Sequence, residues 1–315
     1  MHNNFITLFN FNYLPQGLTM YFSLIKNYPS ANLWVLCMDK KVENYLKKKK
    51  LSNLKIISLK EFENKRLLKI KKKRKFLEYC WTITPFLPSY FFKKFKKKSV
   101  TYLDADLFFY KKLNPIFKEF ANSGKSVFIT EHGFHKKYDF IKKNGRFCVQ
   151  FIIYKNDMKS KKILNWWQIK CIEWCHDYHQ DNKFGDQKYL DEWPKLFKSK
   201  IHISKNLKFF QGPWTFNRFN INDIILYHFH GLKLNSSKIL IYNRYGFTNE
   251  IINRIYKPYI ISLKNTLKHI NSTFTQSSER FFRVKTLYYN LRFNVLKNKI
   301  NKRLVFDLNK IDEKN

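Results

Sequence analysis

The chain has 315 residues, of which 44% are hydrophobic and 18% aromatic. This is enough apolar material for one large α/β domain or two small ones, and it excludes an intrinsically disordered protein. Its 61 lysine and arginine residues outnumber the 23 acidic residues, for a formal net charge of +38. That charge suits nucleic acid, an anionic membrane surface or a phosphorylated substrate. It also suits a genome rich in A and T, since codons for Lys, Asn, Ile, Phe and Tyr are rich in those bases.

The cysteines and the N-terminal sequence bear on the compartment. Five cysteines are scattered through the chain, mostly within apolar stretches, which is typical of reduced, intracellular thiols. The N-terminus has no signal-peptide pattern, and no stretch approaches the ~20 apolar residues that cross a bilayer. We therefore expect a cytoplasmic protein, with peripheral attachment to the inner face of the membrane as an open alternative.

Short apolar runs alternate with helical patterns along most of the chain. Strands are expected over residues 5–9, 32–38, 54–58, 100–103, 127–130, 147–154 and 224–229. Helices are expected over residues 15–26, 41–50, 61–75, 76–95 with a break at Pro85 and Pro88, from Pro115 onward, and over 161–178. This alternation predicts a βαβ sheet flanked by helices. Beyond about residue 243 the segments are basic and aromatic, with helical spacing over 279–300.

An acidic pair, Asp104-Ala105-Asp106, follows directly after the strand predicted over 100–103. Ligands of open α/β sheets bind beyond the carboxyl ends of strands. Two carboxylates two residues apart can point to one cation, and such oxygen ligands suit Mg²⁺ or Mn²⁺. The alternative is a solvated turn carrying two surface acids.

This acidic pair, followed far downstream by an apolar strand and His228-Phe229-His230-Gly231, resembles the GT-A fold glycosyltransferases, in particular glycosyltransferase family 8. The resemblance implies that Asp104, Asp106 and His228 bind a divalent cation, Mn²⁺ or Mg²⁺. That cation would bridge the diphosphate of a nucleoside-diphosphate sugar. The alternative for His228 is a partly buried core histidine.

The resemblance extends to residues expected at the nucleotide. Gly231 and Lys233 would contact the diphosphate, since a glycine lets the backbone N–H approach a phosphate without a Cβ in the way. Lys233 lies two residues after Gly231, where the family has three, and the family's following Pro-Trp is absent. Thr7, Asn10 and Tyr13 resemble the family's nucleotide-binding entry, with an aromatic ring covering the sheet edge as the alternative for Tyr13.

Phe184-Gly185-Asp186-Gln187 is similar to the family's Asp-Gln-Asp element near the acceptor, with Lys188 in place of the second Asp. The resemblance implies that Asp186 and Gln187 are catalytic; a helix N-cap is the alternative for Asp186. Cys148 and Gln150 depart from the family's Phe-Asn-Ala-Gly segment.

A zinc cluster is a second candidate metal site in the sequence. It would use Cys171, Cys175, His176 and His179. We reject it, because Cys171 belongs to a helical stripe with Ile163, Trp167, Trp174 and Tyr178 that predicts burial, and the spacing matches no standard finger.

We therefore expect a GT-A, Rossmann-like mixed sheet flanked by helices over residues 1–242 and a basic, helical extension over 243–315. The expected activity is metal-dependent transfer of a hexosyl group from a UDP-sugar to a hydroxyl of a glycan or lipid-linked acceptor, in cell-surface polysaccharide synthesis. Retention of anomeric configuration is implied by the family resemblance alone.

Two other functions stay open. One is a basic protein that binds nucleic acid or an anionic membrane without catalysis. Nucleic acid is disfavoured as a partner, because the lysine runs at 47–50 and 71–75 are spread along the chain rather than gathered into one module. The other is a metal-dependent phosphoesterase or nucleotidyltransferase, which would usually require more acidic ligands.

Overall fold

The computed structural model describes residues 2–235, 238–241, 245–270 and 304–307. The chain divides into two compact units, Met1–His228 and Phe229–Asn315, and each is described by itself below. The predicted domain boundary after residue 242 stays a prediction. All five cysteines are buried and free of disulfides.

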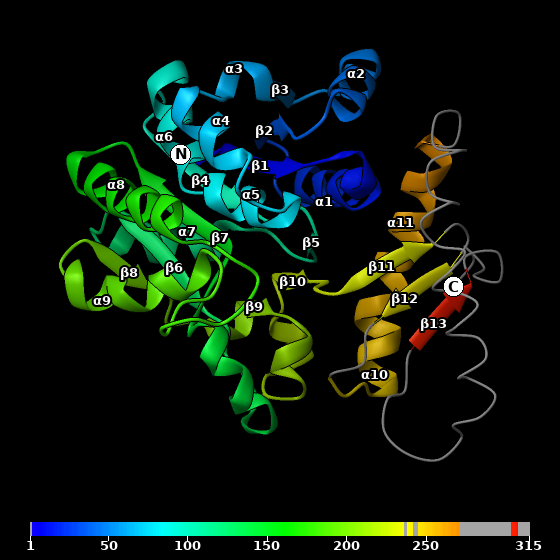
Figure 1. Ribbon diagram of the computed structural model, residues 1–315. Helices are drawn as coiled ribbons and strands as arrows, with labels where there is room; N and C mark the ends of the chain where they lie inside the picture. Colours follow the sequence, from blue (N-terminus) through cyan, green and yellow to red (C-terminus); the bar gives the residue numbers. More distant parts are fainter. Residues whose placement is uncertain (1, 236–237, 242–244, 271–303, 308–315) are drawn as a thin grey trace. The chain divides into compact units, whose positions relative to one another are not determined.

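The first unit is built on a seven-stranded sheet in the order β3-β2-β1-β4-β7-β6-β8 (Figure 1). Its strands are β1 Asn4–Phe9, β2 Asn32–Cys37, β3 Leu54–Ser58, β4 Ser99–Leu103, β6 Val127–Glu131, β7 Phe147–Lys155 and β8 Ile201–Ile203. β7 runs antiparallel to both of its neighbours, β4 and β6, whereas the other pairs are parallel. The mixed sheet expected from the sequence is confirmed.

Helices flank this sheet. The α-helices are α1 Leu14–Asn27, α2 Lys40–Lys49, α3 Leu59–Phe62, α4 Lys65–Lys71, α5 Phe76–Ile83, α6 Phe86–Phe95, α7 Asn114–Asn122, α8 Met158–Glu173 and α9 Trp193–Leu196. Short 3-10 turns are η1 Phe11–Tyr13, η2 Lys136–Asn144, η3 Gln187–Glu192, η4 Leu207–Phe209, η5 Pro213–Thr215 and η6 Ile221–Asp223. Most helices begin or end within a few residues of the predicted positions.

Alternating side chains of the strands divide the core into two layers. Ile6 and Trp34 belong to one apolar cluster with residues of α5, α6 and α8, and the Trp34 ring lies 4.9 Å from that of Phe91 on α6. Phe5 points to the other face, where its ring lies 6.2 Å from that of Phe117 on α7. Burial of each such side chain contributes roughly 1.5–3 kcal/mol, so both helical layers are held by the sheet.

Two predicted helices differ from the structure in their ends. The helix expected over 161–178 begins three residues earlier, because Asp157 caps it by accepting a hydrogen bond from Ser160 N at 2.8 Å. It ends at Glu173, where the chain becomes extended at Trp174. The basic helix expected over 61–75 is split into α3 and α4, because Asn64 caps the second of them. The expected break at Pro85 separates α5 from α6.

A small three-stranded sheet lies at the end of the first unit. It contains β5 Leu107–Phe109, β10 Leu226–His228 and β9 Phe210–Gln211, in that order. β10 pairs with β5 in antiparallel fashion, and Leu107 is the direct partner of His228. Strands of two or three residues are too short to show a period of two, so β5 and β9 were not expected.

The second unit contains the antiparallel strands β11 Leu232–Asn235, β12 Lys238–Ile241 and β13 Leu304–Asp307. Its helices are α10 Asn249–Ile251, the π-helix η7 Ile252–Tyr256 and α11 Lys257–Ile270, which confirms a helical C-terminal region. The ring of Phe229 stacks on that of Tyr259 at 3.7 Å. The helix predicted over 279–300 lies outside the described residues. Among the described helices, none has the length and hydropathy that crossing a bilayer requires.

Candidate active site

The acidic pair lies at the carboxyl end of β4, in the middle of the large sheet. All five residues of β4 are buried, and Asp104 N, just beyond its end, donates to the Gln150 carbonyl of β7 at 3.0 Å. A turn over Asp104-Ala105-Asp106 then leads into β5. Because Leu107 of β5 pairs with His228 of β10, strand register brings the histidine beside the acids across 122 residues of sequence (228 minus 106).

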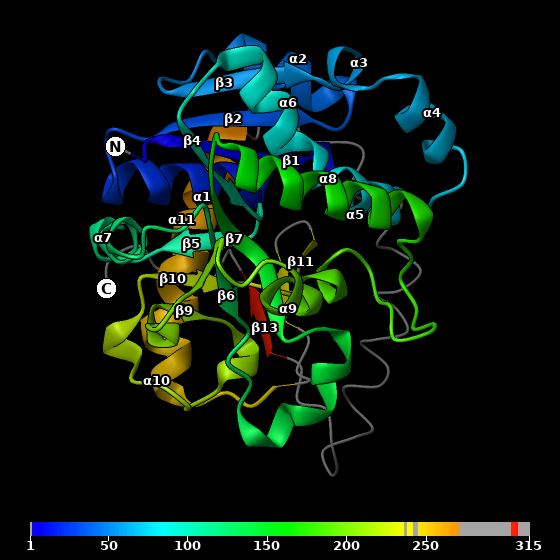
Figure 2. The ribbon, with the colours of Figure 1, turned by 90° about the vertical axis from the view of Figure 1, so that its left-hand side faces the viewer.

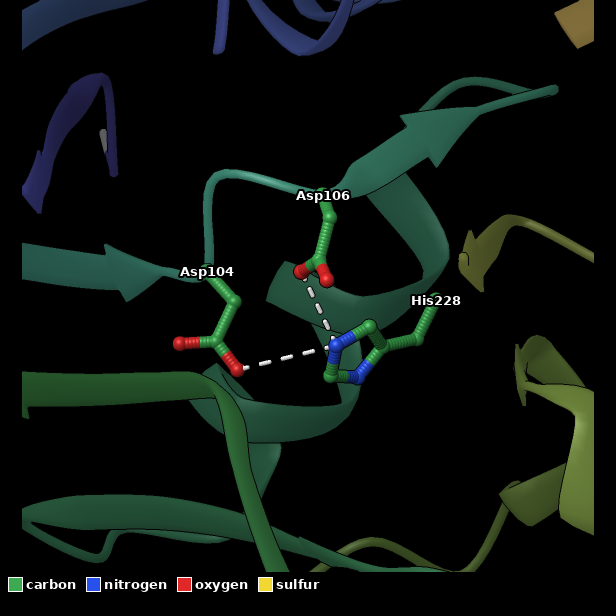
Figure 3. Close-up of side chains that lie close together, drawn as sticks. All are labelled: Asp104, Asp106 and His228. Carbon is green, nitrogen blue, oxygen red and sulfur yellow. Dashed lines mark ion pairs between the residues drawn. The ribbon is translucent and has the colours of Figure 1, made fainter. Parts of the chain in front are cut away.

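Figure 3 shows the two carboxylates directed at the same ring nitrogen of His228. Nε2 of that ring lies 2.9 Å from Asp106 Oδ1 and 3.9 Å from Asp104 Oδ2. One ligand atom from each of the three residues lies within 4.8 Å of the others. Across the part of the chain that the structure describes, no other trio of His, Cys, Asp or Glu is arranged in this way. Cys171, Cys175, His176 and His179 are not part of this group.

Burial and mutual charge perturb the cluster strongly. Burial, with the negative charge of Asp106, raises the pKa of Asp104 to about 7, although the charge of His228 opposes this rise. Burial alone would lower the pKa of His228, but the charge of Asp106 and its hydrogen bond raise that pKa well above the usual value. Positive charge is therefore favoured between the two carboxylates. Two carboxylates and one imidazole are a donor set that fits Mn²⁺ or Mg²⁺.

Gln150 supports this cluster from β7. Its Oε1 lies 3.0 Å from His228 Nδ1, and both side chains are buried. With Oε1 as acceptor, Nδ1 carries the proton and Nε2 is the nitrogen that faces the acids. Gln150 Nε2 is also buried and makes no hydrogen bond in the described part of the chain. In the sequence, Gln150 stood out only as a departure from a family pattern. The feature that could have indicated its role is the presence of an amide within the apolar run of 147–154.

Two further segments border His228. The indole ring of Trp214 lies 5.3 Å from the His228 ring, and its Nε1 donates to the His132 carbonyl at 2.6 Å. Burial raises the pKa of Cys148, but the charges and hydrogen bonds of His132 and His228 outweigh this and lower it to about 6. The Trp214 ring therefore packs edge-on against the imidazole of His228.

The two residues predicted to be catalytic differ in surroundings. Asp186 is buried just before η3, and burial, followed by the negative charge of Asp104, raises its pKa well above the usual value. Its carbonyl accepts from Trp167 Nε1 at 2.9 Å. Gln187 instead donates its side-chain amide to the Asn144 carbonyl of η2 at 3.0 Å. The charge of Asp104 thus acts on Asp186, whereas the Gln187 amide is hydrogen-bonded to η2.

The three residues predicted at the nucleotide entry also differ. Thr7 is fully buried within β1, and Asn10 Oδ1 accepts from Tyr13 N at 3.2 Å. Tyr13 is 46% exposed. Partial burial and, to a smaller extent, the negative charges of Asp106 and Asp104 raise the pKa of Tyr13 to about 12. Of the three, only Tyr13 offers an exposed ring near the acidic pair.

Gly231 and Lys233 belong to the second unit. Gly231 has a φ of 78°, a left-handed conformation that favours glycine. Lys233 lies in β11 with an exposed side chain. Their expected contacts with a diphosphate stay predictions.

The sequence has relatives among known bacterial proteins, although no family model matches it. It is 29% identical over 295 residues to the uncharacterized protein YfnD of Bacillus subtilis, covering 88% of this chain and 94% of YfnD. It is 31% identical over 253 residues to the uncharacterized protein YfnF of the same organism, covering 74% of this chain and 83% of YfnF. The chain belongs to the YfnF family.

Solved structures show the fold of this YfnF-family member. The galactosyltransferase LgtC, solved with donor and acceptor sugar analogs, matches with a TM-score of 0.53 at 13% identity, over 83% of this chain and 95% of LgtC. The apo glycosyltransferase GlyE of Streptococcus pneumoniae matches with a TM-score of 0.50 at 13% identity, over 89% of this chain and 66% of GlyE. The GT-A glycosyltransferase fold predicted from the sequence is confirmed, and LgtC fits the resemblance to family 8.

Proposed function

We propose that this protein is a metal-dependent glycosyltransferase that moves a sugar from a nucleoside diphosphate, most simply a UDP-sugar, to a hydroxyl acceptor. The observation that carries the proposal is the convergence of Asp104, Asp106 and His228 at the carboxyl end of β4. That place is where open α/β sheets bind their ligands. The GT-A fold supports the same chemistry.

The transfer breaks the bond between the anomeric carbon and the diphosphate oxygen and forms a bond from that carbon to the acceptor oxygen. The acceptor's proton leaves with the diphosphate. A bound Mn²⁺ or Mg²⁺ supplies charge neutralisation at the diphosphate. In this proposal Asp104, Asp106 and His228 hold the cation, while Gly231 and Lys233 contact the diphosphate.

Other residues orient the donor in this proposal. Tyr13 offers its exposed ring to the base, with Asn10 holding the Tyr13 backbone in place. Asp186 faces the sugar, and its burial, which raises its pKa, favours the neutral form of the carboxyl. Gln187 acts through its hydrogen bond to the Asn144 carbonyl, and Thr7 acts as part of β1. Such positioning contributes to catalysis by fixing the reacting atoms.

The finer features of this function are the anomeric configuration of the product, the acceptor and the cellular location. We propose a retaining transfer to a glycan or lipid-linked acceptor in cell-surface polysaccharide synthesis, with the protein in the cytoplasm or peripheral on the membrane. LgtC, a galactosyltransferase solved with donor and acceptor sugar analogs, supports a sugar acceptor. An NMR analysis of the product linkage tests retention, and an inverted anomer contradicts it.

The test of activity measures nucleoside diphosphate released from a panel of UDP- and GDP-sugars, with Mn²⁺ and with a chelator. We expect release that requires the metal and falls about 100-fold or more in Asp106→Asn. Asp139→Asn is the matched control, because Asp139 is half-exposed and pairs with Lys142 on the surface. Release that persists with the chelator, or that is equal in both variants, contradicts the proposal.

A further inference from the structure

The segment from α4 to the start of α5 has an unusual concentration of positive charge. Between Asn64 and Glu78 the sequence has eight lysine and arginine residues and no acid. Seven of these eight basic side chains are exposed. Figure 2 shows α4 standing out from the other helices that cover the sheet. The segment therefore presents a cationic surface on a projecting part of the first unit.

The same segment also exposes large apolar side chains. Leu68, Phe76 and Leu77 are 45%, 51% and 48% exposed. Leu67 is 1% exposed, so α4 is anchored to the core and its outer face is that of a folded helix. A single exposed leucine is ordinary, but three such side chains within ten residues, among cations, are not. We call residues 65–77 the α4–α5 surface.

Acidic side chains near this surface neutralise little of its charge. Glu63 accepts from Lys71 Nζ and from the Tyr79 hydroxyl, each at 2.7 Å. Glu78 is buried and accepts from backbone N–H groups of Lys75 and Asp177. Within the described residues, Lys71 is the only cation of the α4–α5 surface that forms an ion pair with an acid. The surface keeps a strong positive potential.

Contacts through α5 connect this surface with the candidate active site. Arg74 Nη1 lies 3.0 Å from His176 Nε2, in the chain that leads from α8 to Asp186. Further along the chain, on α5, the Trp81 ring packs on Gly185, where an added Cβ would lie 3.2 Å from it. A ligand held at the α4–α5 surface is therefore held beside the segment that carries Asp186.

We propose that the α4–α5 surface docks the protein on an anionic lipid bilayer. Its lysines and arginines would lie at the lipid phosphates, while Leu68, Phe76 and Leu77 enter the headgroup region. Two of the three apolar side chains, Leu68 and Leu77, are aliphatic, which favours a bilayer over single-stranded nucleic acid, whose bases stack on aromatic side chains. Delivery of a lipid-linked acceptor rests on the proposed glycosyltransferase function, whereas docking itself does not.

Sedimentation of the full chain with vesicles of phosphatidylglycerol and phosphatidylcholine tests the proposal, with pure phosphatidylcholine vesicles for comparison. We expect binding to the anionic vesicles only. The double variant Lys69→Gln, Lys72→Gln should bind about 30-fold more weakly, at about 5-fold for each cation near the surface. The double variant Leu68→Ser, Phe76→Ser should bind about 10-fold more weakly, through lost apolar burial.

Matched variants elsewhere in the first unit separate this surface from total charge and hydrophobicity. Lys41→Gln with Lys48→Gln removes two exposed cations of α2, and Phe140→Ser removes an aromatic ring that is 64% exposed. Both should bind vesicles like the wild type. Equal loss in the control and test variants overturns the proposal, as does undiminished binding in the test variants.

Two further measurements complete the test. A single-stranded oligonucleotide should not release the protein from the vesicles at comparable phosphate concentration. If it does, and if the Leu68→Ser, Phe76→Ser variant binds vesicles as the wild type does, the surface binds nucleic acid and the bilayer proposal is overturned. Binding of UDP with Mn²⁺ should be unchanged in all of these variants. If neither the wild type nor any variant binds UDP but the vesicle results hold, the proposed function fails and the docking surface stands.

Discussion

At the scale of single residues, the imidazole of His228 is held from two sides. Asp106 lies at Nε2 and Gln150 at Nδ1, at 2.9 and 3.0 Å. The backbone carbonyl of Gln150 also accepts from Asp104 N. Gln150 thus contacts two of the three proposed ligands and fixes which nitrogen of His228 faces the acids. Such outer contacts typically change metal affinity by 10- to 100-fold.

We predict that Gln150→Leu lowers the affinity for Mn²⁺ by about 10- to 100-fold, because Nδ1 loses its acceptor and the ring loses its fixed tautomer. Gln150→Glu keeps an acceptor at this place and should retain binding within a few-fold of the wild type. Electron paramagnetic resonance of free Mn²⁺ measures the affinity in the absence of any sugar nucleotide.

Gln168→Leu is the control for a lost hydrogen-bonded amide, since the partly buried Gln168 donates to the Pro85 carbonyl and to Ser89, between α6 and α8. It should leave Mn²⁺ affinity unchanged. Wild-type affinity in Gln150→Leu, or an equal loss in Gln168→Leu, would show that Gln150 has no positioning role.

The three converging side chains were predicted from the sequence, but the residue that supports them, Gln150, was not. Asp104 and Asp106 were found from their spacing after a strand, and His228 from the family resemblance. Gln150 was missed, because its contact depends on the pairing of β4 with β7 and of β5 with β10. No local pattern encodes a contact between residues 78 apart.

At the scale of elements, Glu78 joins α5 to the loop that follows α8. Its carboxylate accepts from Lys75 N, from Asp177 N and from His176 Nδ1, at 2.9, 3.2 and 3.2 Å. Burial raises the pKa of Glu78, but these hydrogen bonds and the charge of His176 outweigh it and lower the pKa. The carboxylate therefore stabilises the fold while it is ionised, and it steadies the chain that leads to Asp186.

We predict that Glu78→Gln lowers the free energy of unfolding by about 2 kcal/mol at pH 7, because charge-assisted hydrogen bonds become neutral. Since the folded pKa is lowered, the contribution of Glu78 is present above the unfolded pKa and is lost as the pH falls through the folded one. Urea denaturation should thus show a difference between wild type and variant that narrows in acid.

Glu173→Gln is the surface counterpart, since Glu173 is 55% exposed in its pair with Lys170. It should change the free energy of unfolding by at most about 0.5 kcal/mol. A Glu78→Gln protein as stable as the wild type at pH 7, or a difference that widens in acid, contradicts this role.

Element prediction succeeded where segments were long enough to show a period. Strands of five or more residues in the large sheet were located within one or two residues, as with β3. The strands β5, β8 and β9 have two or three residues, so neither alternation nor composition marks them. β13 pairs with β12 across more than 60 residues of sequence, a distance over which local patterns carry no information.

At the scale of the whole molecule, the net charge of +38 fits several partners and selects none. Composition indicated a globular protein, and the alternation of predicted strands and helices indicated an α/β sheet. The proposed function rests on three residues and their resemblance to a family, set within a confirmed fold. The central claim is therefore that this protein binds a nucleoside diphosphate through a divalent cation held by Asp104, Asp106 and His228.

Calorimetry of the full chain with UDP, with and without Mn²⁺, tests this claim most directly. We predict binding that requires Mn²⁺ and that weakens at least about 10-fold in Asp106→Asn, since that variant loses one anionic ligand of the cation. Binding of UDP that is independent of Mn²⁺ and unchanged in Asp106→Asn, or the absence of binding to the wild type under both conditions, would contradict it.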